Sequence, residues 1–333
     1  MVCLEKVLGK TLPKEKESIK VGDDIFANID GILRSSAYIS EAQKQTEETF
    51  GYKWHQRDTF GSKESRLLMR EWLVKKYGDL SRVTWWDEYG ESPVVLDAGC
   101  GAAFSAIELF KGLFDEISYL GADISRAVDV AKERFEDEGL NGEFLQCDLG
   151  SLPFQEESID VIFSEGVLHH TDSTENALKS LSKLVRPGGR FLFYVYNKKG
   201  PIREYTDDYI REKISDMSSE ESWEYLKPLS KFGEELGKMD VTINVPEDIE
   251  VLDMPAGKMS LQRFFYWHIF KGFYHEDLTF EEMHHINFDW YAPTNAARQT
   301  PEEVRKWCEE SNMIIEREVI EPAGITIVAK KKL

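Results

Sequence analysis

Residues 94–105, VVLDAGCGAAFS, join an apolar run to an aspartate and two glycines, Asp97, Gly99 and Gly101. A glycine-rich turn after a strand commonly approaches a nucleotide, and the dinucleotide fingerprint requires a third glycine three residues after the second. Phe104 stands at that position. A carboxylate beside the turn repels a pyrophosphate and attracts a cationic amino group. The turn therefore favours a ligand with an amino-acid tail and no phosphate.

Three further strand ends carry polar residues that suit the rest of such a ligand. Asp123 ends the second expected strand, where a carboxylate can accept hydrogen bonds from both hydroxyls of a ribose. Asp148 follows the third strand, and its carboxylate could accept from an exocyclic amine such as that of adenine. The fourth strand ends at 164–166, SEG, and runs on to two histidines. Ribose, adenine and an amino-acid tail together describe S-adenosylmethionine (SAM).

The elements that must position these residues alternate along the chain from residue 93. Short β-rich runs separated by helix-length segments predict βαβ units and a parallel sheet with helices on both faces. We expect strands at 93–99, 118–124, 143–148, 159–166 and 189–196, and helices at 103–114, 125–139 and 173–185. The alternation of strands and helices resumes at Thr300, with a capped helix at 300–310 and two closing strands at 312–322 and 324–332.

The block from Val94 to Tyr196 resembles the core of the class I SAM-dependent methyltransferases. The resemblance rests on VLDAGCGAAFS, GADIS, QCDLGSLPFQEESIDVIFSEGVLHHTD and LVRPGGRFLF, about a hundred contiguous residues in the right order. It implies a doubly wound, mostly parallel sheet of seven strands, with the last strand antiparallel to the rest. It also implies that SAM is the cofactor, with these binding residues: Asp97, Gly99 and Gly101 for the methionine moiety, Asp123 for the ribose, Asp148 and Leu149 for the adenine, Ser164 near the sulfonium, and Ile124 as a further cofactor contact.

Four segments follow from these patterns. Residues 1–80 form an N-terminal extension that is helical toward its end and partly covers the cofactor site, with Phe50, Tyr52 and Trp54 as the covering aromatics. Residues 81–196 are the SAM-binding core, and 300–333 close it. Residues 197–299 interrupt the rhythm and form a largely helical cap or lid, for acceptor binding or for a dimer contact. The aromatic run at 261–274 is apolar on nearly every face, which predicts burial in the protein or in a homodimer.

The histidines and the aromatic insertion supply the acceptor candidates. His169 and His170 could include a general base, because imidazole titrates near neutrality, or they could cap a helix and pack. The stretch HHINFDWY suits a small-ligand pocket, although a structural role is equally compatible with it. The candidates are His169, His170 and His285 as catalytic residues, and Glu165, Tyr205, His284, Asn287, Trp290 and Tyr291 as substrate residues. Tyr205 and Arg203 also fit a solvated helix face.

Charge and cysteine usage narrow the class of protein. Of the 333 residues, 61 are acidic and 41 basic, giving a net charge of −20. A surface this acidic repels phosphate backbones, so nucleic acid is a poor substrate unless a basic patch is concealed. The four cysteines form no C-x-x-C pair, which predicts neither a disulfide framework nor a zinc site and fits a reducing cytoplasm. The sequence shows no signal peptide and no apolar run long enough to cross a membrane.

The sequence therefore predicts a cytoplasmic SAM-dependent methyltransferase that acts on a small molecule without a metal. The acceptor atom, whether oxygen, nitrogen, sulfur or carbon, stays open. The alternatives are a non-catalytic SAM-binding scaffold, a protein or RNA methyltransferase, and a nicotinamide oxidoreductase on the same fold. Asp97 and Phe104 argue against the last of these.

Overall fold

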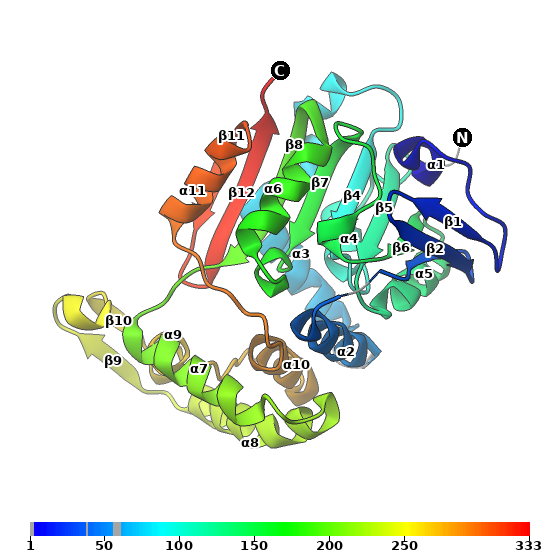
Figure 1. Ribbon diagram of the computed structural model, residues 1–333. Coiled ribbons are helices and arrows are strands. Elements are labelled where there is room, and N and C mark those ends of the chain that lie inside the picture. The colour runs from blue at the N-terminus through cyan, green and yellow to red at the C-terminus, as the bar shows by residue number, and fades with distance from the viewer. Residues whose placement is uncertain (1–2, 38, 56–60) are drawn as a thin grey trace.

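The computed structural model describes residues 3–37, 39–55 and 61–333. One large sheet crosses the molecule, with its described strands in the order β1-β2-β3-β6-β5-β4-β7-β8-β12-β11 (Figure 1). The strands are β1 (Ser18–Val21), β2 (Asp24–Ile29), β3 (Ile32–Ser35), β4 (Val94–Ala98), β5 (Ser118–Asp123), β6 (Glu143–Gln146), β7 (Ile159–Glu165), β8 (Val185–Tyr196), β11 (Met313–Ile320) and β12 (Gly324–Lys331).

Seven of these strands lie in the stretches where the sequence predicts them. The run β6-β5-β4-β7-β8 is parallel, and β12 is antiparallel to both of its neighbours, β8 and β11. The chain winds outward in one direction from β4 and returns to start again at β7, so the topological switch point lies between these two strands. Ligands of open α/β sheets bind at this point, beyond the carboxyl ends of the strands.

The sheet has three more described strands than the seven expected, because β1–β3 extend it at the β6 edge. These strands form an antiparallel meander whose last member, β3, pairs in parallel with β6. The guanidinium of Arg34 on β3 holds the junction, since it donates to Gln146 and pairs with Asp129. The sequence analysis did not predict this meander, and buried and exposed residues alternate only loosely along its strands.

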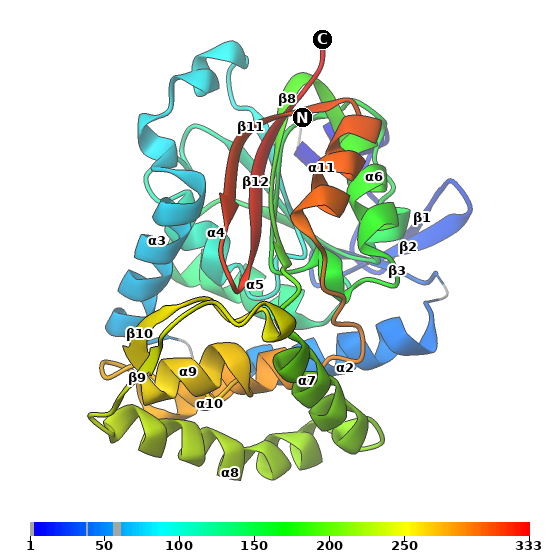
Figure 2. The same ribbon diagram turned by 90° about the vertical axis from the view of Figure 1, so that its left-hand side faces the viewer.

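Helices cover both faces of the sheet, as Figure 2 shows. One face carries α3, α4 and α5, and the other carries α6 and α11 (Figure 2). Each face has its own buried apolar cluster, formed between the strands and these helices. The helices outside the insertion are α1 (Cys3–Leu8), α2 (Glu41–His55), α3 (Lys63–Tyr77), α4 (Phe104–Leu109), α5 (Ala127–Asp137), α6 (Thr174–Leu184) and α11 (Pro301–Glu310).

Residues 197–299 form a separate layer at the carboxyl ends of the parallel strands, beside α2 (Figures 1 and 2). We call this layer the cap. A third apolar cluster joins it to the ends of β8 through Tyr194, Tyr196, Trp223 and Phe288. The cap consists of α7 (Pro201–Ile214), α8 (Ser219–Lys238), β9 (Thr242–Val245), β10 (Gly257–Ser260), α9 (Leu261–His268) and α10 (Phe280–Tyr291).

The aromatic run in the cap is less enclosed than its composition predicts. On α9, Gln262 and His268 are buried, whereas the four aromatic residues between them are half-buried. Two of these, Tyr266 and Trp267, face a cavity instead of an apolar core. None of the described helices is long and apolar enough to cross a membrane.

Candidate functional site

A cavity of about 700 Å³ lies between the carboxyl ends of the parallel strands and the cap. The core contributes the residues after β4, β5, β6 and β7 and the end of β8. The N-terminal extension contributes α2 and α3, and the cap contributes α7, α9, α10 and the segment between the last two. This volume falls in the usual range of small-ligand sites, roughly 300–1,000 Å³.

The glycine turn after β4 forms one wall of the cavity. Gly99 has φ +83°, and a Cβ on it would lie 2.2 Å from the Val167 side chain. A Cβ on Gly101 would lie 2.7 Å from Nε1 of Trp54. The Gly101 N–H donates to Asp123 Oδ2 at 2.8 Å, which ties the turn to the end of β5. Only glycine fits these positions without displacing a neighbour, so the turn packs directly against Val167 and Trp54.

Asp97 lies at the end of β4 and lines the cavity, although it is only 3% exposed. Burial raises its pKa to about 7, against the hydrogen bond that its Oδ2 accepts from the Tyr119 hydroxyl at 2.7 Å. The group is therefore close to half-ionised at neutral pH. A cationic partner in the cavity would favour its charged form.

Asp123, Ile124, Asp148 and Leu149 also line the cavity, as the sequence predicts. Burial raises the pKa of Asp123, although its carboxylate accepts from the N–H and hydroxyl of Ser125 and from the turn. A carboxylate has about four acceptor sites, so one remains for a hydroxyl of a ligand. Burial likewise raises the pKa of Asp148. Each expected carboxylate thus reaches the same chamber from a different strand.

Ser164 does not line the cavity. Its side chain is fully buried, and its hydroxyl donates to the carbonyl of Ala98 at 2.8 Å. This contact links β7 to β4 at the switch point. We therefore assign Ser164 a structural role in place of the expected cofactor contact.

The two adjacent histidines divide between the cavity and the core. His170 lines the cavity, its Nδ1 contacts the Asn295 carbonyl at 2.6 Å, and its Nε2 has no partner among the described residues. Burial lowers its pKa to about 4, so the imidazole is neutral at physiological pH. His169 is fully buried, stacks on Tyr196 with ring centroids 3.6 Å apart, and does not line the cavity. Of the pair, only His170 can meet a ligand.

Glu165 reaches the cavity but is held by two buried partners from α3. Lys76 Nζ lies 2.5 Å from its Oε1, and the Tyr77 hydroxyl donates to its Oε2. The Lys76 ammonium is fully buried between the rings of Trp72 and Tyr194, 3.4 Å from each centroid, and burial lowers its pKa to about 8. The sequence did not indicate this cluster, since 88 or more residues separate α3 from its partner.

The expected acceptor residues of α10 mostly stabilise the cap. His284 accepts from the Ser230 hydroxyl at 2.7 Å and donates to the Trp223 carbonyl at 3.0 Å, so both ring nitrogens are engaged. The Asn287 amide donates to Ser230 and accepts from the Phe273 N–H. His285 is buried edge-on against Trp54, with ring centroids 5.5 Å apart. None of these three α10 side chains lines the cavity, because each faces a neighbouring helix or loop.

Trp290 is the one expected cap residue that lines the cavity, and its indole N–H donates to Asp207 at 2.8 Å. The Tyr291 hydroxyl instead accepts from the backbone N–H of Lys271. Tyr205 is 72% exposed and stacks on Tyr209, so the substrate contact expected of it is wrong for this structure. The described residues contain no group of three or more side chains placed to hold a metal ion.

Several cavity residues carry no motif that the sequence could reveal. Lys53 on α2 forms an ion pair of 2.6 Å with Asp289 on α10, which closes the cavity between extension and cap. Burial alone would raise the pKa of Asp289, but Lys53 and its other cationic neighbours lower it to about 2. Phe50 and Trp54 on α2 also line the cavity, whereas Tyr52 packs against cap aromatics.

The sheet order, the glycine turn at the switch point and the three carboxylates at strand ends define the core of a class I SAM-dependent methyltransferase. A family model described as a methyltransferase domain matches residues 96–193. This segment is thus a methyltransferase domain, and its motifs are similar to those of the class I SAM-dependent family.

Curated relatives agree on the class but differ in their acceptors. A tRNA (carboxymethyluridine(34)-5-O)-methyltransferase of Xenopus tropicalis is 29% identical over 46% of this chain and 26% of its own length. An uncharacterized methyltransferase of Bacillus subtilis, YodH, is 29% identical over 51% of this chain and 70% of its own length. The ubiquinone/menaquinone biosynthesis C-methyltransferase of Vibrio campbellii is 28% identical over 34% of this chain and 46% of its own length. The chain thus spans about a quarter of the first of these relatives, and about half of the third.

Proposed function

We propose that the protein transfers the methyl group of SAM to a small-molecule acceptor held between the strand ends and the cap. The cavity carries this proposal, because carboxylates suited to SAM line its core side and a different set of residues lines its cap side. SAM supplies an electrophilic methyl group on a sulfonium. The protein then has to align the acceptor with that group and exclude water from the site.

We assign the two ends of SAM to different strand ends. Asp97 and the glycine turn hold the methionine moiety, because a buried carboxylate that lines this part of the cavity suits an ammonium. Asp123 holds one ribose hydroxyl, and Asp148 with Leu149 holds the adenine. Tyr119 orients the Asp97 carboxylate through its hydroxyl.

His170 is the residue placed to receive a proton, if the acceptor must lose one. Its Nε2 has no partner among the described residues, and its Nδ1 is fixed by a backbone carbonyl, which sets the tautomer with Nδ1 protonated. The low pKa keeps Nε2 unprotonated at physiological pH, so the lone pair is available. A nucleophile that is already anionic would not need this step.

A tRNA acceptor is the second candidate, and the names of the tRNA methyltransferase relatives are what favour it. The net charge of −20 opposes it, because a phosphate backbone would meet an acidic surface. A scaffold that binds SAM without transfer is the third. The first candidate predicts a methylated small molecule, the second predicts methylated tRNA, and the third predicts no methylated product.

The test uses radiolabelled SAM, the intact protein, and an extract of its source organism divided into total tRNA and a fraction of small metabolites. We expect label in the metabolite fraction only. Asp97→Ala should abolish transfer and SAM binding by calorimetry, whereas Asp115→Ala, at an exposed carboxylate outside the cavity, should change neither. Label confined to tRNA, or SAM binding with no transfer to any fraction, would reject the small-molecule proposal.

A further inference from the structure

Six lysine and arginine side chains line the cavity, and three of them have a carboxylate partner. Lys53 pairs with Asp289 at 2.6 Å. Lys75 pairs with Glu321 at 2.5 Å, and Arg203 pairs with Asp207 at 2.8 Å. The other three, Lys199, Arg263 and Lys271, form no ion pair with any described residue.

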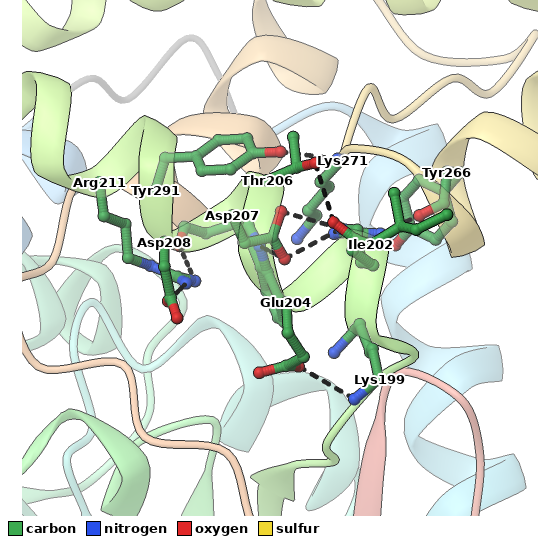
Figure 3. Close-up of polar contacts among 12 residues, drawn as sticks. Lys199, Ile202, Glu204, Thr206, Asp207, Asp208, Arg211, Tyr266, Lys271 and Tyr291 are labelled. Carbon is green, nitrogen blue, oxygen red and sulfur yellow. Dashed lines mark hydrogen bonds and ion pairs between the residues drawn. The ribbon is translucent and has the colours of Figure 1, made fainter. Parts of the chain in front are cut away.

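Two of the unpaired cations meet at the same ring. Lys199 Nζ lies 4.2 Å from the centroid of Trp290 and donates to the Asn197 carbonyl at 3.0 Å. Lys271 Nζ lies 4.7 Å from the same centroid, and the residue is 8% exposed. Figure 3 draws Lys199 beside Glu204, which accepts from its backbone N–H, and Lys271 beside Asp207. That carboxylate is already engaged by Arg203 and by the Trp290 indole.

The third unpaired cation, Arg263, belongs to α9 on the same side of the cavity. Its guanidinium lies over the rings of Tyr266 and Phe273, 5.2 and 6.0 Å from their centroids. The aromatic rings give these three cations some stabilisation, but each contact is worth only about 0.5–2 kcal/mol. Three basic side chains thus gather on the cap side without an ion-pair partner of their own among the described residues.

Such an arrangement is costly without a ligand. Burying an ammonium disfavours its charged form, and burial accordingly lowers the pKa of Lys271 to about 7 and that of Lys199 well below its usual value. An anionic ligand would restore both lysines to their charged form. A neutral, apolar acceptor would leave them unpaired and desolvated. The chain has 20 more acidic than basic residues, but the two carboxylates that act on Lys271 are already paired, Asp289 with Lys53 and Asp207 with Arg203.

We propose that the acceptor is a small organic anion, whose carboxylate or phosphate binds Lys199 and Lys271 beside Trp290, with Arg263 at the rim. This inference rests on the proposed methyltransferase function. The flat faces of Tyr196 and Trp290, whose centroids are 4.3 Å apart, place an aromatic wall next to the two ammonium groups. The cations point into an enclosed chamber, so they serve a small anion and not the backbone of a folded nucleic acid.

The first experiment separates acceptors by charge before the reaction. The metabolite fraction is passed over an anion exchanger at pH 8, and the flow-through and the retained pool are each incubated with the protein and labelled SAM. We expect label only in reactions with the retained pool. Phosphatase treatment of that pool then distinguishes the two sources, because transfer persists for a carboxylate and disappears for a phosphate.

The second experiment removes the cations one at a time and uses the retained pool as the acceptor. Lys199→Met and Lys271→Met should each raise the apparent KM for the acceptor by about ten- to a hundredfold, as expected for loss of a charged hydrogen bond. The kcat and the calorimetric Kd for SAM should change little, which also shows that the variants fold. Lys271→Arg should recover part of the loss. Lys258→Met, the same charge change at an exposed cap position, is the control.

The outcomes distinguish a failure of the anionic-acceptor proposal from a failure of the proposed methyltransferase function. Transfer from the flow-through pool alone, or lysine variants with an unchanged KM, would overturn the anionic acceptor while the methyltransferase function stands. SAM binding without transfer from either pool would overturn the proposed function, and the inference with it.

Discussion

We expect Asp97 to make SAM binding depend on pH in the physiological range. Its carboxylate faces the cavity, accepts one hydrogen bond from Tyr119, and has a pKa raised to about 7 by burial. We propose that it pairs with the ammonium of the methionine moiety. The ionised form therefore binds SAM well and the protonated form binds it poorly.

The expected size follows from the ionised fraction of the free protein. With a pKa of about 7, the carboxylate is about 50% ionised at pH 7 and about 10% ionised at pH 6. Because an α-amino group stays mostly protonated only below about pH 7, the association constant for SAM is compared between pH 7 and pH 6, where it should fall about fivefold. The affinity for SAM should therefore increase as the pH rises.

Calorimetry with S-adenosylhomocysteine measures this, because the product keeps the amino-acid tail and cannot react. The control is Asp97→Asn, which retains an acceptor for Tyr119 and cannot ionise. Lys271 has a pKa of about 7 as well, so only the difference between the two proteins reports on Asp97. We expect weak, nearly pH-independent binding by the variant. A slope that is the same in both proteins would refute the assignment of Asp97 to the ammonium.

The same substitution should have the opposite effect on stability. A carboxyl whose pKa is raised from 3.8 to about 7 in the folded state contributes stability when protonated and loses that contribution as pH rises through 7. At pH 8, Asp97→Asn should therefore raise the free energy of unfolding, by up to about 4 kcal/mol, in the absence of SAM. At pH 3 the two proteins should differ little on this account. Denaturant melts at pH 8 and pH 3 test whether the substitution raises the free energy of unfolding at the higher pH only.

Three further substitutions test other parts of the site. Gly99→Ala should weaken SAM binding at least tenfold, because the new methyl would overlap Val167 and strain a φ of +83°, whereas Gly90→Ala, with open space around it, should be silent in calorimetry. His170→Asn should lower kcat by roughly a hundredfold if the acceptor loses a proton, with an unchanged Kd for SAM; an unchanged kcat would remove His170 from the reaction. Arg203→Met strands a buried carboxylate and should cost about 3–5 kcal/mol in denaturant melts, most of it recovered by adding Asp207→Leu; equal losses in both variants would contradict this.

The donor side of the site could be predicted from sequence because its residues follow strands directly. In an open α/β sheet each parallel strand delivers its carboxyl end to one edge, so Asp97, Asp123 and Asp148 meet although about 25 residues separate them in the chain. The turn at Gly99 and Gly101 could be predicted because a strand precedes it and a helix follows it. Ser164 was the exception, since its position at a strand end did not reveal that it turns toward the neighbouring strand.

The acceptor side could not be predicted, because its residues come from elements whose packing no local pattern specifies. Lys53 lies on α2, and Lys199 lies just before α7. Arg263 lies on α9, and Lys271 follows it. The composition of the HHINFDWY stretch predicts a ligand pocket, but adjacent residues of a helix point in different directions, so only some of them can face one cavity. His284 and Asn287 therefore serve the α8 contact while Asp289 and Trp290 reach the cavity.

The cavity is divided by charge in a way that suits two substrates of opposite character. Carboxylates from three strand ends line the core side, and the cap side carries Lys199, Arg263 and Lys271 together with one carboxylate, Asp289, which is paired with Lys53. A cationic donor and an anionic acceptor would each be attracted to one side and repelled by the other, so charge alone would enforce their order across the chamber. The same division explains how a chain with a net charge of −20 can hold an anion, since the cations that bind it are enclosed and the acidic surface lies outside. Reversing the sign at one position, as in Lys271→Glu, should thus exclude an anionic acceptor while SAM binding is retained.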